Sequence, residues 1–207
     1  MLNLKAKKTD ETKKFRYKGK TQTVPVYEIS TQKLQYNIRN GRIATEAREF
    51  NQTGKDLKSL SVDARNKIIS EWLWNKDRTK NEATKADIEE KSQMEAGVVT
   101  NDGIILDGNR RFMLISRLNA ENSSPIPFHA AVVDETFGDS LADDLELKLL
   151  ENNLQRDIDE KVGYSPIEKY IEIHDMYQYI KEGLITKKTI INSFKSNQLK
   201  SEEQLDN

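Results

Sequence analysis

The 207-residue chain has no cysteine, only four prolines and nine glycines, and no long apolar run. The lack of cysteine excludes disulfides, a thiolate nucleophile and a zinc site with cysteine ligands. No apolar run approaches the roughly 20 residues that span a bilayer. The N-terminal stretch MLNLKAKKTDETKK also lacks the apolar core of a signal peptide. We therefore expect a cytoplasmic protein with no membrane segment.

Charge is abundant but nearly balanced: charged residues make up 32% of the chain, hydrophobic residues 36%, and the net charge is -1. Basic residues gather in 1–20, whereas 134–151 is acidic. A basic arm can bind nucleic acid by releasing counterions, and a frayed, solvated terminus is the blander alternative. We divide the chain into this arm at 1–20, a main domain at 21–160 and a helical extension with a polar tail at 161–207.

Hydrophobic periodicity predicts both strands and helices. Alternation predicts a hairpin that ends near Ile29 and strands at 97–100, 104–106 and 128–133. Spacing and caps predict helices at 44–52, 62–74, 84–94, 110–119, 140–152, 165–181 and 186–194, with Ser61 as a cap and 76–83 as a loop. This order predicts an α+β fold, with a small mixed sheet, surrounding helices and a C-terminal helical extension.

One short segment combines a strand end, a glycine and two arginines: Asp107-Gly108-Asn109-Arg110-Arg111. The first N–H groups of a helix have no internal partner and, with the helix dipole, form an anion site. Arginines in the first turn oppose that dipole, and a bound phosphate would reverse the sign of their effect. Gly108 would let the backbone approach a ligand closely. The alternative is that the arginines pair with Asp107 and nearby acids.

Two further segments carry candidate ligands. Residues 151–156, Glu-Asn-Asn-Leu-Gln-Arg, offer a carboxylate, amides and an arginine that can hold hydrated Mg²⁺ and the phosphates it bridges. Ordinary capping at a helix C-terminus is the alternative. The donor-rich stretch 37–42 contains Arg39 and Arg42, which can grip a base or a phosphate. An ordinary surface loop is the alternative there.

These segments together resemble the ParB/sulfiredoxin superfamily. Residues 97–117, GVVTNDGIILDGNRRFMLISR, resemble its signature, in which a short strand pair leads into a G-x-x-R box that opens a helix. Asn153–Arg156 resembles the second half of its E-N-x-x-R box. Other segments resemble the first strand, the N-x-R loop and a later helix start, in family order: 24–29, 36–42 and 165–168. The resemblance covers roughly residues 21–179.

The resemblance implies a ParB/sulfiredoxin-like fold and a site for CTP or ATP with Mg²⁺. Carried over residue by residue, it places the phosphates against Gly108 and Arg111, with Arg110, Asn109 and Asp107 beside them. It further implies Asn153 and Glu151 as metal ligands, Arg156 as a phosphate ligand, Glu151 as the catalytic carboxylate, and Arg39 and Arg42 as further nucleotide contacts. The resemblance also implies partners in a DNA-linked process such as segregation or phage defence: DNA, a second copy of the chain or another protein.

One departure leaves the enzymatic activity open. The family's glutamate directly precedes its asparagine, but Asn152 stands there and Glu151 lies one residue earlier. One residue is about 100° of helix rotation, so binding with weak or no turnover is an alternative to an NTPase. A non-enzymatic DNA- or protein-binding adaptor and a metal-dependent nuclease using Asp107 and Glu151 are further alternatives. Sulfiredoxin activity is excluded because it needs a cysteine.

Overall fold

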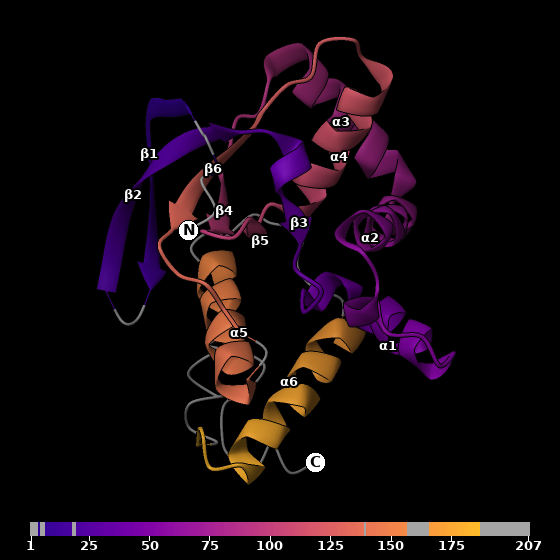
Figure 1. The fold of residues 1–207 in the computed structure, drawn as a ribbon, viewed down its shortest axis with the longest axis vertical. Helices are drawn as coiled ribbons and strands as arrows, with labels where there is room; N and C mark the ends of the chain where they lie inside the picture. Colours follow the sequence, from indigo (N-terminus) through magenta and orange to yellow (C-terminus); the bar gives the residue numbers. More distant parts are fainter. Residues whose placement is uncertain (1–3, 5–6, 18–19, 139, 157–165, 187–207) are drawn as a thin grey trace.

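The computed structural model describes residues 4, 7–17, 20–138, 140–156 and 166–186 (Figure 1). These residues form an α+β fold with one mixed six-stranded sheet and six α-helices. The mixed sheet with surrounding helices agrees with the fold class expected from the sequence. The helix expected at 186–194 falls almost wholly outside the described residues, as does most of the extension from 161 onwards.

The sheet has the strand order β1-β2-β6-β4-β5-β3. Its strands are β1 (Lys7–Tyr17), β2 (Lys20–Ile29), β3 (Gln35–Tyr36), β4 (Gly97–Thr100), β5 (Ile104–Asp107) and β6 (Phe128–Val133). Strands β1, β2 and β6 pair antiparallel, as do β4 and β5, whereas β4 runs parallel to β6 and β3 parallel to β5. The parallel pairs require crossovers, and α4 and the α1–α3 segment supply them.

Six α-helices and three short 3₁₀ helices surround the sheet. The α-helices are α1 (Ala44–Gln52), α2 (Val62–Lys76), α3 (Arg78–Lys91), α4 (Asn109–Glu121), α5 (Leu141–Arg156) and α6 (Pro166–Lys181). The 3₁₀ helices are η1 (Thr31–Lys33), η2 (Gly41–Ile43) and η3 (Leu57–Ser59). Within the described residues, no helix has the length and the apolar character that crossing a membrane requires.

Two cores cover the two faces of the sheet, because successive strand side chains point to opposite faces. On one face Val99 and Ile105 pack with Phe112 and Ile115 of α4. On the other face a second core brings strand residues against α5: Val98, Leu106, Ala131, Leu147, Leu150 and Leu154. Figure 1 shows α5 below the sheet and α6 running diagonally between α5 and α1.

The N-terminal basic arm is part of the fold rather than a frayed terminus over residues 7–17. There β1 pairs with β2 along almost its full length, and Phe15 is buried in the core under α5. Lys13 of β1 donates from Nζ to the carbonyl of Ala96, the residue before β4, at 2.5 Å. The alternation of the sequence predicted the hairpin but not the length of its first strand.

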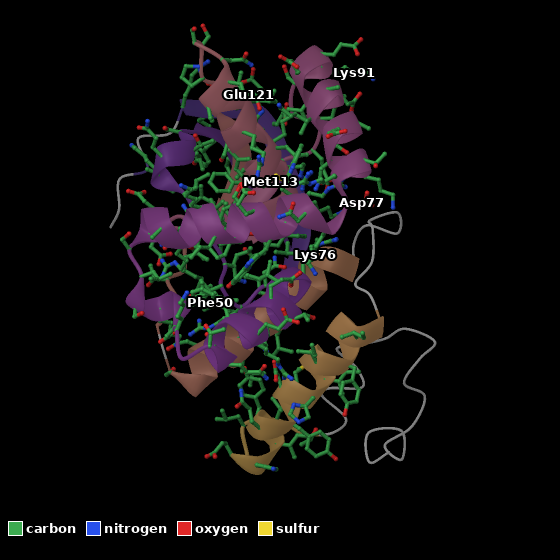
Figure 2. All side chains as sticks on the ribbon, turned by 90° about the vertical axis from the view of Figure 1, so that its right-hand side faces the viewer. Phe50, Lys76, Asp77, Lys91, Met113 and Glu121 are labelled. Carbon is green, nitrogen blue, oxygen red and sulfur yellow. The ribbon has the colours of Figure 1, made fainter. Side chains whose placement is uncertain are left out.

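The turn between α2 and α3 corrects a second expectation. Residues 76–83, predicted as a loop, contain only one non-helical residue, Asp77, whose side chain accepts from the Lys80 amide and caps α3. Ser61 caps α2 as predicted, by accepting from the Ala64 amide. Figure 2 shows α3 and α4 side by side, with Lys91 and Glu121 at the same end and Asp77 at the corner where α2 meets α3. The starts of α3 and α4 are therefore neighbours.

Candidate functional site

The start of α4 follows directly on the end of strand β5. Strand β5 ends at Asp107, and Gly108 is the residue before the helix, with φ 97° and ψ 17°. No side chain caps this end, and the first turn contains no acidic residue. The positive partial charge of the first N–H groups is thus not compensated by a carboxylate of the helix itself.

Gly108 is required for a different reason from the one expected. Its φ lies in the left-handed region, which favours glycine. A Cβ added there would lie 3.0 Å from the Phe128 ring and 3.4 Å from the Cα of Gly97. The space beside this residue is therefore filled by packed protein, and the turn and the packing both require a glycine here.

The two adjacent arginines diverge. Arg111 donates from Nη1 to a Glu95 carboxylate oxygen at 2.6 Å and from Nη2 to Asp107 Oδ2 at 3.3 Å. Lys13 lies 3.4 Å from the same two carboxylates. Arg111 thus belongs to a cluster of two cations and two carboxylates that joins β1, β5 and α4. For Arg111, the structure therefore agrees with the alternative that the arginines pair with nearby acids.

Arg110 has only neutral hydrogen-bond partners. Its Nε donates to Asn81 Oδ1 at 2.7 Å and its Nη2 to Thr84 Oγ1 at 3.2 Å, both from α3. Among the described residues, no carboxylate forms an ion pair with this half-buried guanidinium. Burial lowers the pKa of Arg110, the neighbouring Arg42 guanidinium lowers it further, and Asp77 has the opposite effect.

The loop at 37–42 sends its two arginines in different directions. Arg42 lies in η2, and its positive charge lowers the pKa of Arg110. Arg39 instead pairs with Asp144 of α5 and donates to the carbonyl of Gly138 at 3.5 Å. Of the predicted arginines, Arg39 and Arg111 therefore pair with carboxylates, whereas Arg110 hydrogen-bonds to neutral groups.

Glu151 also meets this loop. Its side chain is 3% exposed and accepts from the amide of Asn37 at 3.5 Å. Asn109 is 4% exposed; its amide nitrogen donates to the Ile105 carbonyl, and its Oδ1 has no hydrogen-bond partner. Asn153 and Arg156 lie in the last turns of α5, and their side chains are outside the described residues. In the described part of the chain, no three His, Cys, Asp or Glu residues gather as a metal site.

Asn81 and Thr84 are the site residues that the sequence reasoning missed. Asn81 is 1% exposed and also donates to the last carbonyls of α2, at Leu73 and Trp74. It therefore fixes Arg110 to the α2–α3 corner. The helix-capping pattern that starts at Asp77 is the signal that could have placed both residues on a helix.

Comparisons of the chain with protein-family models and with curated proteins found no match. The chemistry of the site therefore rests on its geometry. The Arg110 guanidinium, whose hydrogen-bond partners are neutral, and the uncapped start of α4 are the two features here that would favour an anion.

Proposed function

We propose that this chain is a ParB-like domain that binds a nucleoside triphosphate, CTP or ATP with Mg²⁺, at the start of α4. The observation that carries the proposal is the pair of guanidiniums, Arg110 and Arg42. Arg110 is half-buried, has only neutral partners and is repelled by Arg42. A phosphate beside Arg110 would give this guanidinium a charge-assisted contact, and contacts of this kind are among the strongest hydrogen bonds.

The surrounding fold supports the ParB-like assignment. A strand pair, β4 and β5, leads directly into α4 at the G-x-x-R segment, which is the arrangement that the resemblance implies. The C-terminal half of α5 brings Glu151 to the loop that carries Arg42. In this proposal Asn153 and Glu151 hold Mg²⁺, Arg156 adds a phosphate contact, and the protein acts in a DNA-linked process such as segregation or defence.

Turnover is proposed to be slow. A hydrolytic carboxylate must orient water at the terminal phosphate. Glu151 is instead buried and accepts a hydrogen bond from Asn37. It also lies one residue before the position of the catalytic glutamate in the ParB pattern, where this chain has Asn152. These features favour a nucleotide-binding switch over an efficient NTPase.

The proposal predicts that Arg110→Ala weakens nucleotide binding by about 10- to 150-fold. One lost charge-assisted contact corresponds to about 1.5–3 kcal/mol, and about 1.4 kcal/mol is tenfold in affinity. Isothermal titration calorimetry with CTP, ATP and GTP, each with Mg²⁺, measures this directly. Arg78→Ala is the matched control, because Arg78 is an exposed arginine of the neighbouring helix that contacts only Asn75.

Wild-type affinity should be retained by the Arg78 variant. The proposal is rejected if none of the three nucleotides binds the wild type, or if the Arg110 and Arg78 variants bind equally well. Thermal unfolding of each variant, recorded in the same buffer, separates a loss of binding from a loss of folding.

A further inference from the structure

The paired ends of β1 and β2 extend beyond the rest of the sheet. Strand β2 pairs with β6 only over residues 26–29, whereas it pairs with β1 as far as Lys20. We call residues 13–17 of β1 and 20–24 of β2 the distal hairpin. Residues 20–23 are all exposed, so both faces of β2 are exposed there, because successive strand side chains point to opposite faces. Figure 1 shows the pair of strands at the left-hand edge of the molecule.

The distal hairpin lies in a strongly basic part of the chain. Residues 12–27 contain no acidic residue and five basic ones: Lys13, Lys14, Arg16, Lys18 and Lys20. The whole chain has a net charge of -1, so this positive charge is a local concentration. Lys13 is paired with two carboxylates. Lys14 and Lys20 are exposed, and neither side chain forms an ion pair or a hydrogen bond with the described part of the protein.

The register of the two strands sets which side chains turn away from the protein. Lys14 is the partner of Thr23 across the pair, and Phe15 is the partner of Gln22. Phe15 is buried in the core under α5. Because alternate strand residues point to opposite faces, Lys14 and Thr23 are on the face turned away from this core. Both are exposed, so the outward face presents an ammonium group beside a hydroxyl group.

A two-stranded ribbon of this kind has the dimensions of the major groove of DNA. That groove is about 12 Å wide and admits either an α-helix or a two-stranded β-ribbon. Lysines contact the phosphates, and threonine and glutamine side chains hydrogen-bond to phosphates or to base edges. Thr21, Gln22 and Thr23 are exposed between the strand end at Lys20 and the body of the sheet. The distal hairpin therefore combines the charge, the shape and the polar groups that this groove accepts.

The same features favour DNA over two other polyanions. Segments that lie on an anionic membrane place large apolar side chains between their cations, but residues 20–23 are Lys, Thr, Gln and Thr. Double-stranded RNA has a deep and narrow major groove that side chains cannot read. A β-ribbon fits the wider groove of DNA.

We infer that the distal hairpin is a binding surface for double-stranded DNA, which it enters through the major groove. Lys14 and Lys20 contact phosphates, and the exposed Thr21, Gln22 and Thr23 contact phosphates or base edges. The inference goes beyond the proposed nucleotide site, because Arg42 and Arg110 lie in η2 and α4, outside the hairpin. It requires no bound nucleotide.

Fluorescence anisotropy with a labelled DNA duplex tests the inference on the full chain without nucleotide. The wild type should bind the duplex saturably, and the affinity should fall between about 50 and 200 mM salt, because binding releases counterions. The double variant Lys14→Gln, Lys20→Gln should bind at least about tenfold more weakly. Its plot of log affinity against log salt should be shallower by about 1.8, since each lost phosphate contact removes about 0.9 from the slope.

The matched control is the double variant Lys67→Gln, Lys181→Gln. It makes the same change of net charge at two exposed lysines of α2 and α6, and it should bind the duplex like the wild type. Thermal unfolding of both double variants checks that each is folded. Absence of saturable DNA binding by the wild type, or equal affinities of the two double variants, overturns the inference. Equally tight binding of duplex RNA or of phosphatidylserine vesicles overturns the assignment to DNA.

The DNA surface and the nucleotide site can fail separately. Arg110→Ala should leave the affinity for the duplex unchanged, and the Lys14, Lys20 double variant should leave the calorimetry with CTP unchanged. If CTP fails to bind while the duplex binds through Lys14 and Lys20, the nucleotide function fails and the DNA surface stands. If Arg110→Ala weakens DNA binding and the hairpin variant does not, the contact lies at α4 and the inference is overturned.

Discussion

The adjacent arginines at the start of α4 have different roles because successive helical side chains point about 100° apart. Arg111 points toward β1 and neutralises two carboxylates, Asp107 and Glu95. Arg110 points toward α3 and meets only neutral groups. Two residues with the same chemistry therefore divide between a structural cluster and a candidate anion site.

The packing role of Gly108 can be tested by comparing alanine substitutions at Gly108 and at Gly54, two glycines with positive φ. Gly108→Ala should destabilise the fold by about 2–4 kcal/mol, because a left-handed conformation costs an alanine roughly 1–2 kcal/mol and overpacking adds a comparable amount. The added Cβ would lie 3.0 Å from Phe128. Gly54→Ala is the control: Gly54 has φ 78° but nothing within 4 Å of the added atom. Urea unfolding of both variants measures the difference.

The control should lose only the conformational part, about 1–2 kcal/mol. Equal destabilisation by the two substitutions would contradict the packing role that the structure gives to Gly108.

At the scale of elements, one chain of polar groups links α6 to α5 and to the loop after β3, beside the ion pairs of Asp175 with Arg48 and Lys148. The Tyr179 hydroxyl donates to Asp144 of α5, and Asp144 pairs with Arg39 in the loop after β3. Burial, and then the hydrogen bond to Asp144, raise the pKa of Tyr179 above its ordinary value of 10.0. A raised pKa in the folded state means that this contribution to stability is complete below pH 10 and is lost as the pH rises further.

We therefore expect the free energy of unfolding to fall above pH 10, with a contribution from Tyr179 of up to about 1.4 kcal/mol per pH unit. Tyr179→Phe should make this decline shallower. Urea unfolding between pH 8 and 11 measures both slopes, and Tyr170→Phe is the control because Tyr170 is 69% exposed. Parallel declines in the wild type and the Tyr179 variant would contradict this account of how α6 docks.

Some of these secondary-structure elements could be predicted from the sequence, and others could not. The Asn-Asp-Gly turn between β4 and β5, the start of α4 and the Ser61 cap were predictable, because each depends on neighbouring residues. The position of β6 between β2 and β4 was not, since strand order is a long-range property. The early start of α3 was missed because its first turns are polar, and that error concealed Asn81 as the partner of Arg110.

At the scale of the whole molecule, the basic N-terminal segment is a structural part of the sheet over residues 7–17. Strand β1 forms one edge of the sheet, contributes Phe15 to the core and ties Lys13 to Asp107. Deleting residues 1–20 would therefore remove part of the core as well as positive charge, so it cannot by itself test the alternative of a DNA-binding adaptor. Exposed lysines such as Lys14 are the suitable positions for that test.

The two arginines of the 37–42 loop have different surroundings. Arg39 pairs with Asp144 of α5, and three positions later Arg42 lowers the pKa of Arg110 at the start of α4. The partner of Arg39 could not be assigned from the sequence, because Asp144 lies more than 100 residues further along the chain.

The most direct test of the central claim is a double-mutant cycle at Arg42 and Arg110. Calorimetry with the preferred nucleotide and Mg²⁺ would be run on the wild type, Arg42→Ala, Arg110→Ala and the double variant. If the two guanidiniums share one triphosphate, each single change weakens binding at least tenfold, and the two losses deviate from additivity by at least about 0.5 kcal/mol. Unchanged affinity in either single variant would contradict the claim.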